Sequence, residues 1–307
     1  MGRSEPPYHV PVLVEEAVAL LGPLSGVAVD ATFGGGGHTR ALLAANPDLR
    51  VVGVDRDPDA APRAVALGPR VTFVLGNFRR LGELVRGAGA DEIAAVFFDL
   101  GVSSHQLDVG ERGLSYHRPG VLDMRLGEDG ALTAEEVVNT WDEADLARVI
   151  RRYGEDPHAA RIAAAIVGAR PLRDAFDLAA VVAGAVPARA RRGAHPARRT
   201  FQAIRIAVND ELGALADGLE EALSLLQRGG RVAVISYHSL EDRVVKRRFA
   251  AGAAGCVCPP DLPVCGCGRS PSLRLVTRGA VMPGEAETAA NPRARSARLR
   301  AAEKVRP

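Results

Sequence analysis

Residues 27–38 read Val27-Ala-Val-Asp-Ala-Thr-Phe-Gly-Gly-Gly-Gly-His38, an apolar run that leads into four consecutive glycines. The apolar run predicts a buried β-strand, and the spacing of the residues that follow predicts a helix. Glycine lets the backbone turn sharply and approach a ligand closely, and a helix N-terminus offers free N–H groups. The stretch therefore predicts a nucleotide or nucleoside site, with a tight turn that binds nothing as the alternative.

Short apolar runs recur along the chain and alternate with segments of helical spacing, starting with a helix at 11–21. This alternation is typical of βαβ units, and nearly continuous apolar runs are typical of parallel strands buried on both faces. The sequence thus predicts an α/β, Rossmann-like fold. Its strands are expected at 27–31, 51–55, 71–75, 94–99 and 231–236, with a last candidate at 273–277.

The middle of the chain shows helical periodicity without a convincing strand, which predicts an inserted helical domain at 111–209. Its helices are expected at 134–140, 143–153, 157–169 and 178–185. The sheet domain is then expected to comprise residues 1–110 and 210–290. Residues 291–307 carry six basic residues against one glutamate and are described as a basic tail.

Composition narrows the class of protein. Hydrophobic residues make up 47% and charged residues 25% of 307, as in ordinary globular proteins. No apolar run approaches the roughly 18 residues needed to span a bilayer, and the polar N-terminus lacks the apolar segment of a signal peptide. We therefore expect a cytoplasmic protein with no membrane association. The net charge of +2 leaves any affinity for nucleic acid to local basic patches.

Two acids select the ligand of the glycine turn. Asp55 ends the second predicted strand, where a carboxylate can accept hydrogen bonds from ribose hydroxyls. Asp30, just before the turn, would repel a pyrophosphate and attract an ammonium group. Thr39 stands where the dinucleotide fingerprint has a third small residue. These residues favour S-adenosylmethionine, with a nicotinamide-dependent oxidoreductase as the alternative.

Two further strand ends belong to the same predicted edge of the sheet. Phe78 follows the third strand, and its ring or backbone could meet an adenine, or the ring could lie in the core. The segment Asp99-Leu-Gly-Val-Ser-Ser-His-Gln106 follows the fourth strand. Because ligands of open α/β sheets lie outside the carboxyl ends of the strands, Asp99 is predicted to serve function rather than structure.

Seven segments together resemble the bacterial small-subunit ribosomal RNA cytosine-N4 methyltransferases, and they span nearly the whole chain. They are Thr32-Phe-Gly-Gly-Gly-Gly-His-Thr-Arg40, Asp55-Arg-Asp-Pro58, Asp99-Leu-Gly-Val-Ser-Ser-His-Gln-Leu-Asp108, Leu122-Asp-Met-Arg125, His195-Pro-Ala-Arg-Arg-Thr-Phe-Gln-Ala-Ile-Arg205, Ile235-Ser-Tyr-His-Ser-Leu-Glu-Asp-Arg243 and Asn291-Pro-Arg-Ala-Arg-Ser296.

The resemblance implies a class I methyltransferase fold with an inserted helical substrate domain. It also implies that the chain methylates the N4 amine of a cytidine in the decoding region of 16S ribosomal RNA, within the small subunit. A non-catalytic assembly factor that retains the fold is the alternative. The Asp99 motif departs from the Pro-Pro-Tyr form of many amino methyltransferases. The family's cofactor contacts carry over onto Gly36, Gly37, His38, Asp55, Phe78, Asp99 and Gln106.

The chemistry of an exocyclic amine calls for hydrogen-bond acceptors rather than a strong base. Asp99 and the Ser103-Ser104 loop could accept from the NH2 group and orient it. Methylation of a cytosine carbon would need a cysteine nucleophile, and no cysteine lies near the cofactor loops. Tyr237 and His238 could stack on or bond to a flipped base; a buried tyrosine and a capping histidine are equally open.

Two basic stretches are candidate RNA contacts, namely residues 189–199 and the tail from Asn291. Both are broken by proline or glycine, which favours RNA contact over a solvated helical face. Only two of the 39 basic residues are lysine, so arginine is common throughout the chain and its abundance does not by itself indicate RNA binding. A structural zinc ion could be held by the four thiolates of Cys256, Cys258, Cys265 and Cys267. Only one residue separates the cysteines of each pair, which is tighter than the usual zinc-site spacing.

Overall fold

The computed structural model describes residues 11–101, 113–117, 120–188, 195–255, 258 and 266–306. The chain divides into two compact units. The sheet unit comprises Met1–Gly101 and Leu212–Pro307, and the helical unit comprises Val102–Glu211. The bounds predicted from the sequence for the inserted domain are 111 and 209.

The sheet unit is built on seven strands in the order β3-β2-β1-β4-β5-β7-β6. Strands β1 to β5 pair in parallel, and β7 is antiparallel to both β5 and β6. This arrangement confirms the predicted α/β, Rossmann-like class. The strands are β1 (Gly26–Asp30), β2 (Leu49–Asp55), β3 (Val71–Leu75), β4 (Ile93–Asp99), β5 (Leu226–Ser236), β6 (Leu273–Leu275) and β7 (Arg298–Lys304).

Strand β7 is an element that the sequence analysis missed, because it described this segment only as a basic tail. Along β7, buried Leu299 and Ala301 alternate with half-exposed or exposed basic residues. Ala301 pairs with Ala233 of β5, inside the sheet. The Arg300 side chain is only 14% exposed, and its Nε and Nη2 donate to the carboxylate of Asp242, which lies in α12 (Ser239–Ala253). Arg300 is thus held in an ion pair within the sheet unit. A contact of the basic tail with RNA stays a prediction.

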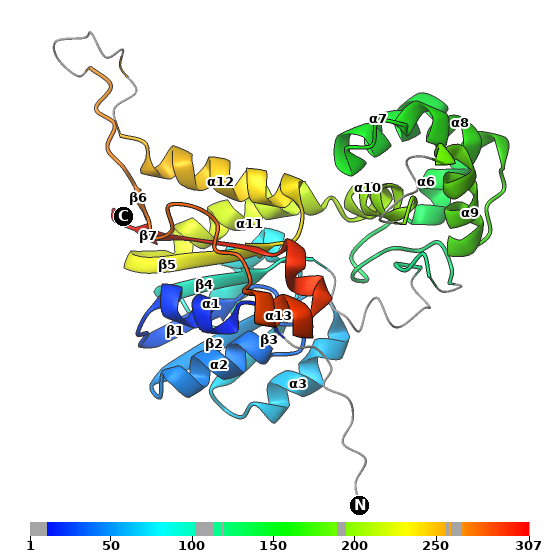
Figure 1. Ribbon diagram of the computed structural model, residues 1–307. Helices are drawn as coiled ribbons and strands as arrows, with labels where there is room; N and C mark the ends of the chain where they lie inside the picture. The colour runs from blue at the N-terminus through cyan, green and yellow to red at the C-terminus, as the bar shows by residue number, and fades with distance from the viewer. Residues whose placement is uncertain are drawn as a thin grey trace, which may run out of the picture. The chain divides into compact units, whose positions relative to one another are not determined.

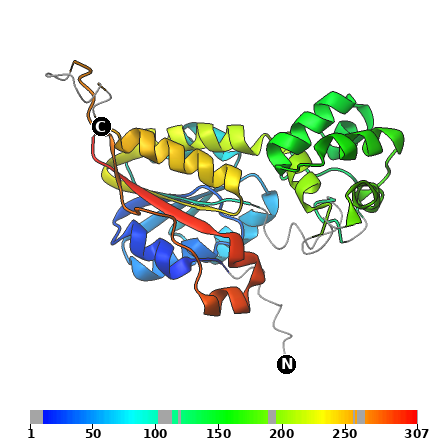
Figure 2. The ribbon, with the colours of Figure 1, turned by 45° about the horizontal axis from the view of Figure 1, so that its top comes forward.

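Helices cover both faces of the sheet (Figures 1 and 2). The neighbouring residues Phe97 and Phe98 of β4 point to opposite faces, since successive strand residues alternate. Phe97 packs in a cluster with α1 (Val14–Leu21) and α2 (Gly37–Ala45). Phe98 packs in a cluster with α4 (Leu81–Gly87), α11 (Glu211–Leu225) and α12 (Ser239–Ala253). The unit also contains η1 (Pro58–Ala60), α3 (Ala61–Ala66), η2 (Phe78–Arg80), α13 (Glu285–Ala290) and η5 (Pro292–Ser296).

The strand order places a ligand site at a defined point of the sheet. From β1 the chain proceeds to β2 and β3 on one side, and then returns to β4 on the other side. The crevice between β1 and β4, at their carboxyl ends, is the position where open α/β sheets bind ligands. Asp30 ends β1, Asp99 ends β4, and Asp55 ends the adjacent β2.

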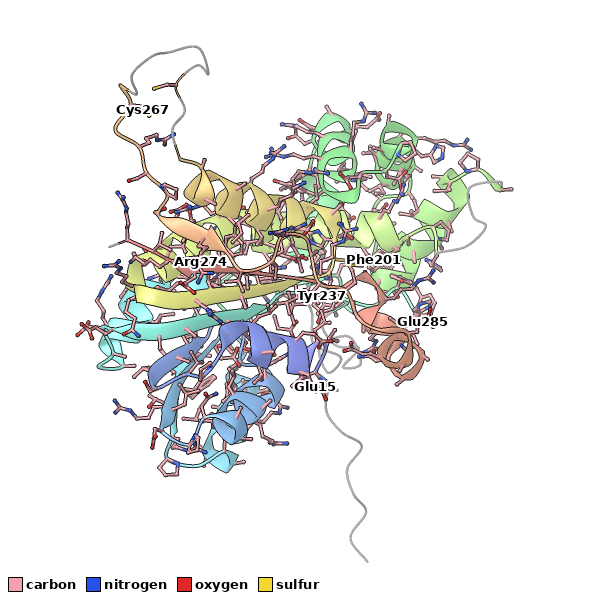
Figure 3. The ribbon with its side chains drawn as sticks, turned by 60° about the vertical axis from the view of Figure 1, so that its left-hand side comes forward. Glu15, Phe201, Tyr237, Cys267, Arg274 and Glu285 are labelled. Atoms are coloured by element: carbon pink, nitrogen blue, oxygen red, sulfur yellow. The ribbon has the colours of Figure 1, made fainter. Side chains whose placement is uncertain are left out.

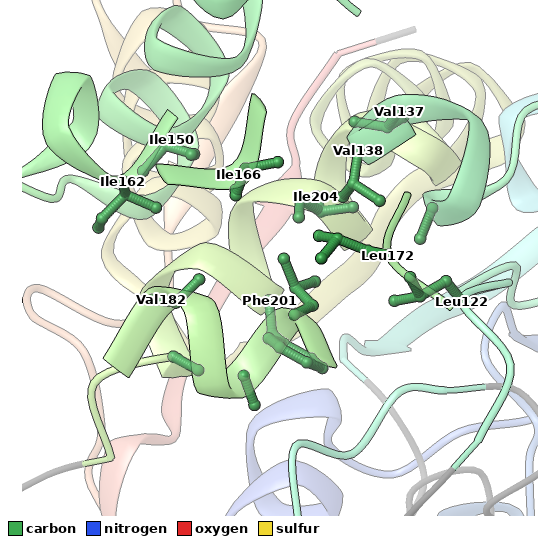
Figure 4. Packing of buried hydrophobic residues seen from close by; sticks show 14 of the residues in the cluster. Leu122, Val137, Val138, Ile150, Ile162, Ile166, Leu172, Val182, Phe201 and Ile204 are labelled. Atoms are coloured by element: carbon green, nitrogen blue, oxygen red, sulfur yellow. The ribbon is translucent and has the colours of Figure 1, made fainter. Parts of the chain in front are cut away.

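The helical unit holds a separate core of aliphatic side chains and Phe201 (Figure 4). Its helices are α6 (Ala134–Thr140), α7 (Glu143–Gly154), α8 (Ala159–Gly168), α9 (Ala175–Ala185) and α10 (Arg198–Asn209). Residues 189–199 are predicted to form a broken run, yet Arg198 and Arg199 form the first turn of α10. Pro196 precedes this helix, where the lack of an N–H costs nothing.

None of the helices within the described ranges is both long and apolar enough to cross a membrane.

Candidate functional site

The glycine turn between β1 and α2 is crowded at one end and open at the other. Gly34 and Gly36 have φ values of +49° and +70°, which L side chains rarely adopt. A Cβ on Gly36 would lie 2.9 Å from the Phe33 ring, and a Cβ on Gly37 would lie 2.8 Å from Pro11. A Cβ on Gly34 would meet no described atom closer than 3.8 Å, so the backbone of this residue is open to a ligand. No described side chain caps α2, so its first N–H groups can also bind a ligand.

Asp55 braces this turn from the end of β2. Its Oδ2 accepts from the Gly34 amide at 2.7 Å, and its Oδ1 accepts from the Asp57 amide at 2.9 Å. Burial raises the pKa of Asp55, and the two backbone hydrogen bonds oppose this rise. Each carboxylate oxygen can accept a second hydrogen bond, so the side chain can hold the turn and still bind a hydroxyl group.

Asp30 plays a different part from the one its sequence position suggested. The residue is only 1% exposed, and its carboxylate accepts from the Thr39 hydroxyl at 2.7 Å and from the Thr32 amide at 3.3 Å. Burial raises the pKa of Asp30 to about 6. Asp30 therefore joins β1 to α2 and acts on a bound cation only through its field. Sequence reasoning noted Thr39 only as a departure from a fingerprint and missed this bond.

Asp99 lies at the centre of a polar network at the end of β4. Its Oδ1 accepts from the Tyr237 hydroxyl at 2.8 Å, and its amide donates to the Thr32 hydroxyl at 2.6 Å. Tyr237 follows β5 (Figure 3), and burial raises its pKa, so the hydroxyl remains a neutral donor. The Asp99 side chain is 15% exposed, and its Oδ2 lies 3.6 Å from Nδ1 of His38.

The protonation of His38 follows from its other ring nitrogen. Nε2 lies 2.9 Å from the Val12 carbonyl, which can only accept, so Nε2 carries the proton. Burial lowers the pKa of His38, which favours the neutral ring. Nδ1 is then an acceptor that faces a second acceptor, Oδ2 of Asp99. Such a pair suits a ligand group that presents two N–H bonds.

The half-buried Phe78 ring packs against the core of the sheet unit. It packs edge-on against Phe98 with centroids 5.6 Å apart, and it lies where a Cβ on Gly218 would come within 2.7 Å. The ring thus has the core contacts that one alternative expected. A contact of the Phe78 ring or backbone with an adenine stays a prediction.

His238 is observed in its capping role. Its Nδ1 accepts from the Glu241 amide at 3.3 Å, and the Glu241 carboxylate accepts from the His238 amide in return. Its Nε2 lies 3.2 Å from the same carboxylate. The start of α12 thus accounts for Nδ1, whereas Nε2 is buried and makes no hydrogen bond to the described residues. A contact of His238 with a nucleobase stays a prediction.

Several predicted site residues lie outside the described residues. They are Ser103, Ser104 and Gln106 of the loop after Asp99, and Cys256 and Cys265 of the cysteine cluster. Cys258 and Cys267 are described and half-buried. The roles proposed for these residues remain predictions.

The donors and acceptors of the crevice decide which class of ligand fits. Three carboxylates and one neutral histidine gather at the carboxyl ends of β1, β2 and β4: Asp30, Asp55, Asp99 and His38. Carboxylates in a site of low dielectric repel a pyrophosphate and attract ammonium, sulfonium and hydroxyl groups. The residues therefore fit S-adenosylmethionine and disfavour a dinucleotide.

Comparison with known proteins gives a consistent result. The sequence matches the MraW methylase family over residues 7–305. It is 51% identical to "Ribosomal RNA small subunit methyltransferase H" of Symbiobacterium thermophilum, over 97% of each chain. Proteins with the same printed name from Heliobacterium modesticaldum and Geobacter sp. are 49% and 48% identical, over 97% of this chain and 99% of theirs.

Proposed function

This chain belongs to the MraW methylase family, and we propose that it transfers the methyl group of S-adenosylmethionine to the N4 amine of a cytidine in 16S ribosomal RNA. The observation that carries this proposal is the cluster of hydrogen-bond acceptors at the carboxyl ends of β1 and β4. The Tyr237 hydroxyl donates to Oδ1 of Asp99 there, and Oδ2 of Asp99 lies beside Nδ1 of His38.

The sheet unit would hold the cofactor with its own backbone and acids. Bound S-adenosylmethionine supplies an electrophilic methyl group on a sulfonium. The backbone at Gly34 and Gly36 and the N–H groups of Gly37 and His38 are the proposed contacts of the glycine turn. The Gly36 N–H itself donates to the Phe33 carbonyl. Asp55 is proposed to accept from ribose hydroxyls while it braces the turn.

Asp99 is the proposed catalytic residue of the described site. The lone pair of the cytosine amine is delocalised into the ring, so the enzyme must orient the NH2 group toward the methyl. A fixed carboxylate can accept one N–H and hold the amine in line, and such positioning contributes roughly several kcal/mol. No strong base is needed beforehand, because the methylated amine becomes acidic and releases its proton. Ser103 and Ser104 are proposed as further acceptors.

The helical unit is proposed to contact the RNA. Arg198 and Arg199 are exposed on the first turn of α10. The Tyr116 ring stacks on His195 at 4.6 Å with an interplanar angle of 15°, and the neighbouring His117 is exposed. Aromatic rings and exposed guanidinium groups are the combination that binds single-stranded nucleic acid, through base stacking and phosphate contacts.

One experiment tests the proposed reaction. Small subunits from a strain that lacks the enzyme would be incubated with methyl-labelled S-adenosylmethionine, then digested to nucleosides. We expect the label in N4-methylcytidine of 16S ribosomal RNA. Its absence, with retained binding to subunits, would instead support the non-catalytic assembly factor, and binding of a nicotinamide dinucleotide would support the oxidoreductase. Free 16S RNA in a parallel reaction would show whether the assembled small subunit is the substrate.

A structural zinc ion on the four cysteines is a separate proposal. It rests on the clustering of all four between Cys256 and Cys267. Metal analysis of the purified protein should find about one equivalent of zinc per chain if four thiolates bind it.

A further inference from the structure

Residues 11–13 form a short strap that lies on the glycine turn. Pro11 packs against Gly37, where a Cβ would approach it to 2.8 Å. Val12 and Leu13 are buried, at 1% and 0% exposure. Leu13 adopts a left-handed conformation with φ of +54° and forms the N-cap of α1, so the chain bends sharply here.

Two hydrogen bonds hold the strap, one from His38 near the start of the sequence and one to Glu287 near its end. The Val12 carbonyl accepts from Nε2 of His38 at 2.9 Å. The Leu13 amide donates to Oε1 of Glu287 at 2.8 Å, across a separation of 274 residues. Glu287 belongs to α13, near the other end of the chain, and is half-buried. The strap thus lies between a helix of the glycine turn and a helix from the C-terminal region.

The first of these contacts sets the chemistry of His38. A backbone carbonyl accepts only, so it stabilises the tautomer in which Nε2 carries the proton and Nδ1 is an acceptor. That tautomer is the one that forms an acceptor pair with Oδ2 of Asp99. Without the Val12 carbonyl, the ring could place its proton on Nδ1, where it would bond to the Asp99 carboxylate and remove the pair.

We propose that Glu287 is a positioning residue for the cofactor site. Its carboxylate holds Leu13, and the strap in turn presents the Val12 carbonyl that fixes His38 as an acceptor beside Asp99. Glu287 touches neither reacting group, and its proposed role is to hold the strap. The inference rests on the proposed function in one respect, namely that the ligand of this site is S-adenosylmethionine.

Glu287 is the member of α13 suited to this role. Its neighbour Glu285 carries the same charge on the same helix but is exposed (Figure 3). The Glu287 carboxylate is also close enough to act electrostatically on both His38 and Tyr237. In His38 this effect is secondary to burial, which lowers the pKa. Glu285 is therefore a matched control for the loss of a carboxylate from α13.

The test measures cofactor affinity and the His38 tautomer in the full chain. Calorimetric binding of S-adenosylhomocysteine should weaken about tenfold in Glu287→Ala, the equivalent of one lost hydrogen bond to a charged group. Glu287→Gln keeps an acceptor oxygen, and its affinity should stay within about threefold of wild type. Glu285→Ala should bind as wild type. In ¹⁵N spectra of histidine-labelled, ligand-free protein, the unprotonated nitrogen of His38 should be Nδ1 in wild type and shift toward Nε2 in Glu287→Ala.

The outcomes separate this inference from the proposed function. Wild-type protein that fails to bind S-adenosylhomocysteine would overturn the proposed function. Wild-type affinity together with an unchanged His38 tautomer in Glu287→Ala would overturn the inference and leave the function standing. Should Glu287→Ala not fold, Gly37→Ala displaces the strap through Pro11. An unchanged His38 tautomer in that variant would likewise overturn the inference, and a shifted one would support it.

Discussion

The two units of this protein place their polar groups differently. In the sheet unit, Asp30, His38 and Asp99 gather at the ends of β1 and β4 and act on one another. In the helical unit, the interior is aliphatic and aromatic, and a buried polar side chain such as Asn209 bonds to backbone groups. Its arginines at the start of α10 are exposed. Interacting buried charges are costly to fold, so their presence supports the proposal that the chemistry takes place in the sheet unit.

The difference also explains why the two units need different kinds of precision. A carboxylate that orients an amine must be fixed, and Asp99 is held through its amide by Thr32 and through Oδ1 by Tyr237. A phosphate contact tolerates a mobile arginine, because the attraction is electrostatic and largely independent of direction. We therefore expect substitutions in the sheet unit to change the rate of methyl transfer, and those in the helical unit to change RNA affinity.

The largest effect is expected from Asp99→Asn, which keeps the shape of the side chain and removes its charge. Loss of a positioned electrostatic group should lower kcat by about 10²-fold or more. Affinity for 16S RNA should change by less than about threefold, because the helical unit is intact. Single-turnover rates and filter binding measure the two quantities. A variant that loses RNA affinity but keeps its rate would reverse the comparison.

Asp30→Asn tests the cost of the buried acid. Burial raises the pKa of Asp30 from 3.8 to about 6, so the folded protein holds a proton that the unfolded chain has released between these values. The stability of the wild type thus falls as pH rises from about 4 to about 6, by up to about 3 kcal/mol. The variant should lack this fall, so its stability relative to wild type should increase with pH. Urea unfolding at several pH values measures the free energy of unfolding, and Asp48→Asn, at an exposed position, is the control. Parallel pH profiles of stability for Asp30→Asn and wild type would contradict the prediction.

Removal of both arginines at the start of α10 should have a smaller effect, confined to binding. Arg198→Ala with Arg199→Ala should weaken RNA binding about tenfold. It should also reduce the slope of log K against log salt concentration by about one to two. At saturating RNA, kcat should remain within about twofold. Arg151→Ala with Arg161→Ala removes the same charge from exposed positions of α7 and α8 and is the matched control. Equal losses in the two double variants would argue against a specific RNA face.

Sequence patterns predicted the parallel strands well because burial on both faces makes them continuously apolar, as in Val96, Phe97 and Phe98. Strand β7 was not predicted because basic residues alternate with Leu299 and Ala301, and a segment so rich in charge resembles a solvated tail. The strand-end acids Asp55 and Asp99 followed from the fold rule. The burial of Asp30 and the bond between Glu287 and Leu13 depend on contacts between distant segments, for which a single sequence carries no local signal.

The smallest effect is expected from Tyr237→Phe, which removes a single hydroxyl group from the sheet unit. Asp99 keeps its backbone bond to Thr32 but loses the donor to Oδ1, so its carboxylate gains freedom to rotate. The loss of one hydrogen bond that acts only through orientation should lower kcat by about threefold to fivefold, with RNA affinity unchanged. Combined with Asp99→Asn, it should add little, since the carboxylate that Tyr237 orients is already gone. If the two losses multiply fully in the double variant, Tyr237 acts on the substrate independently of Asp99.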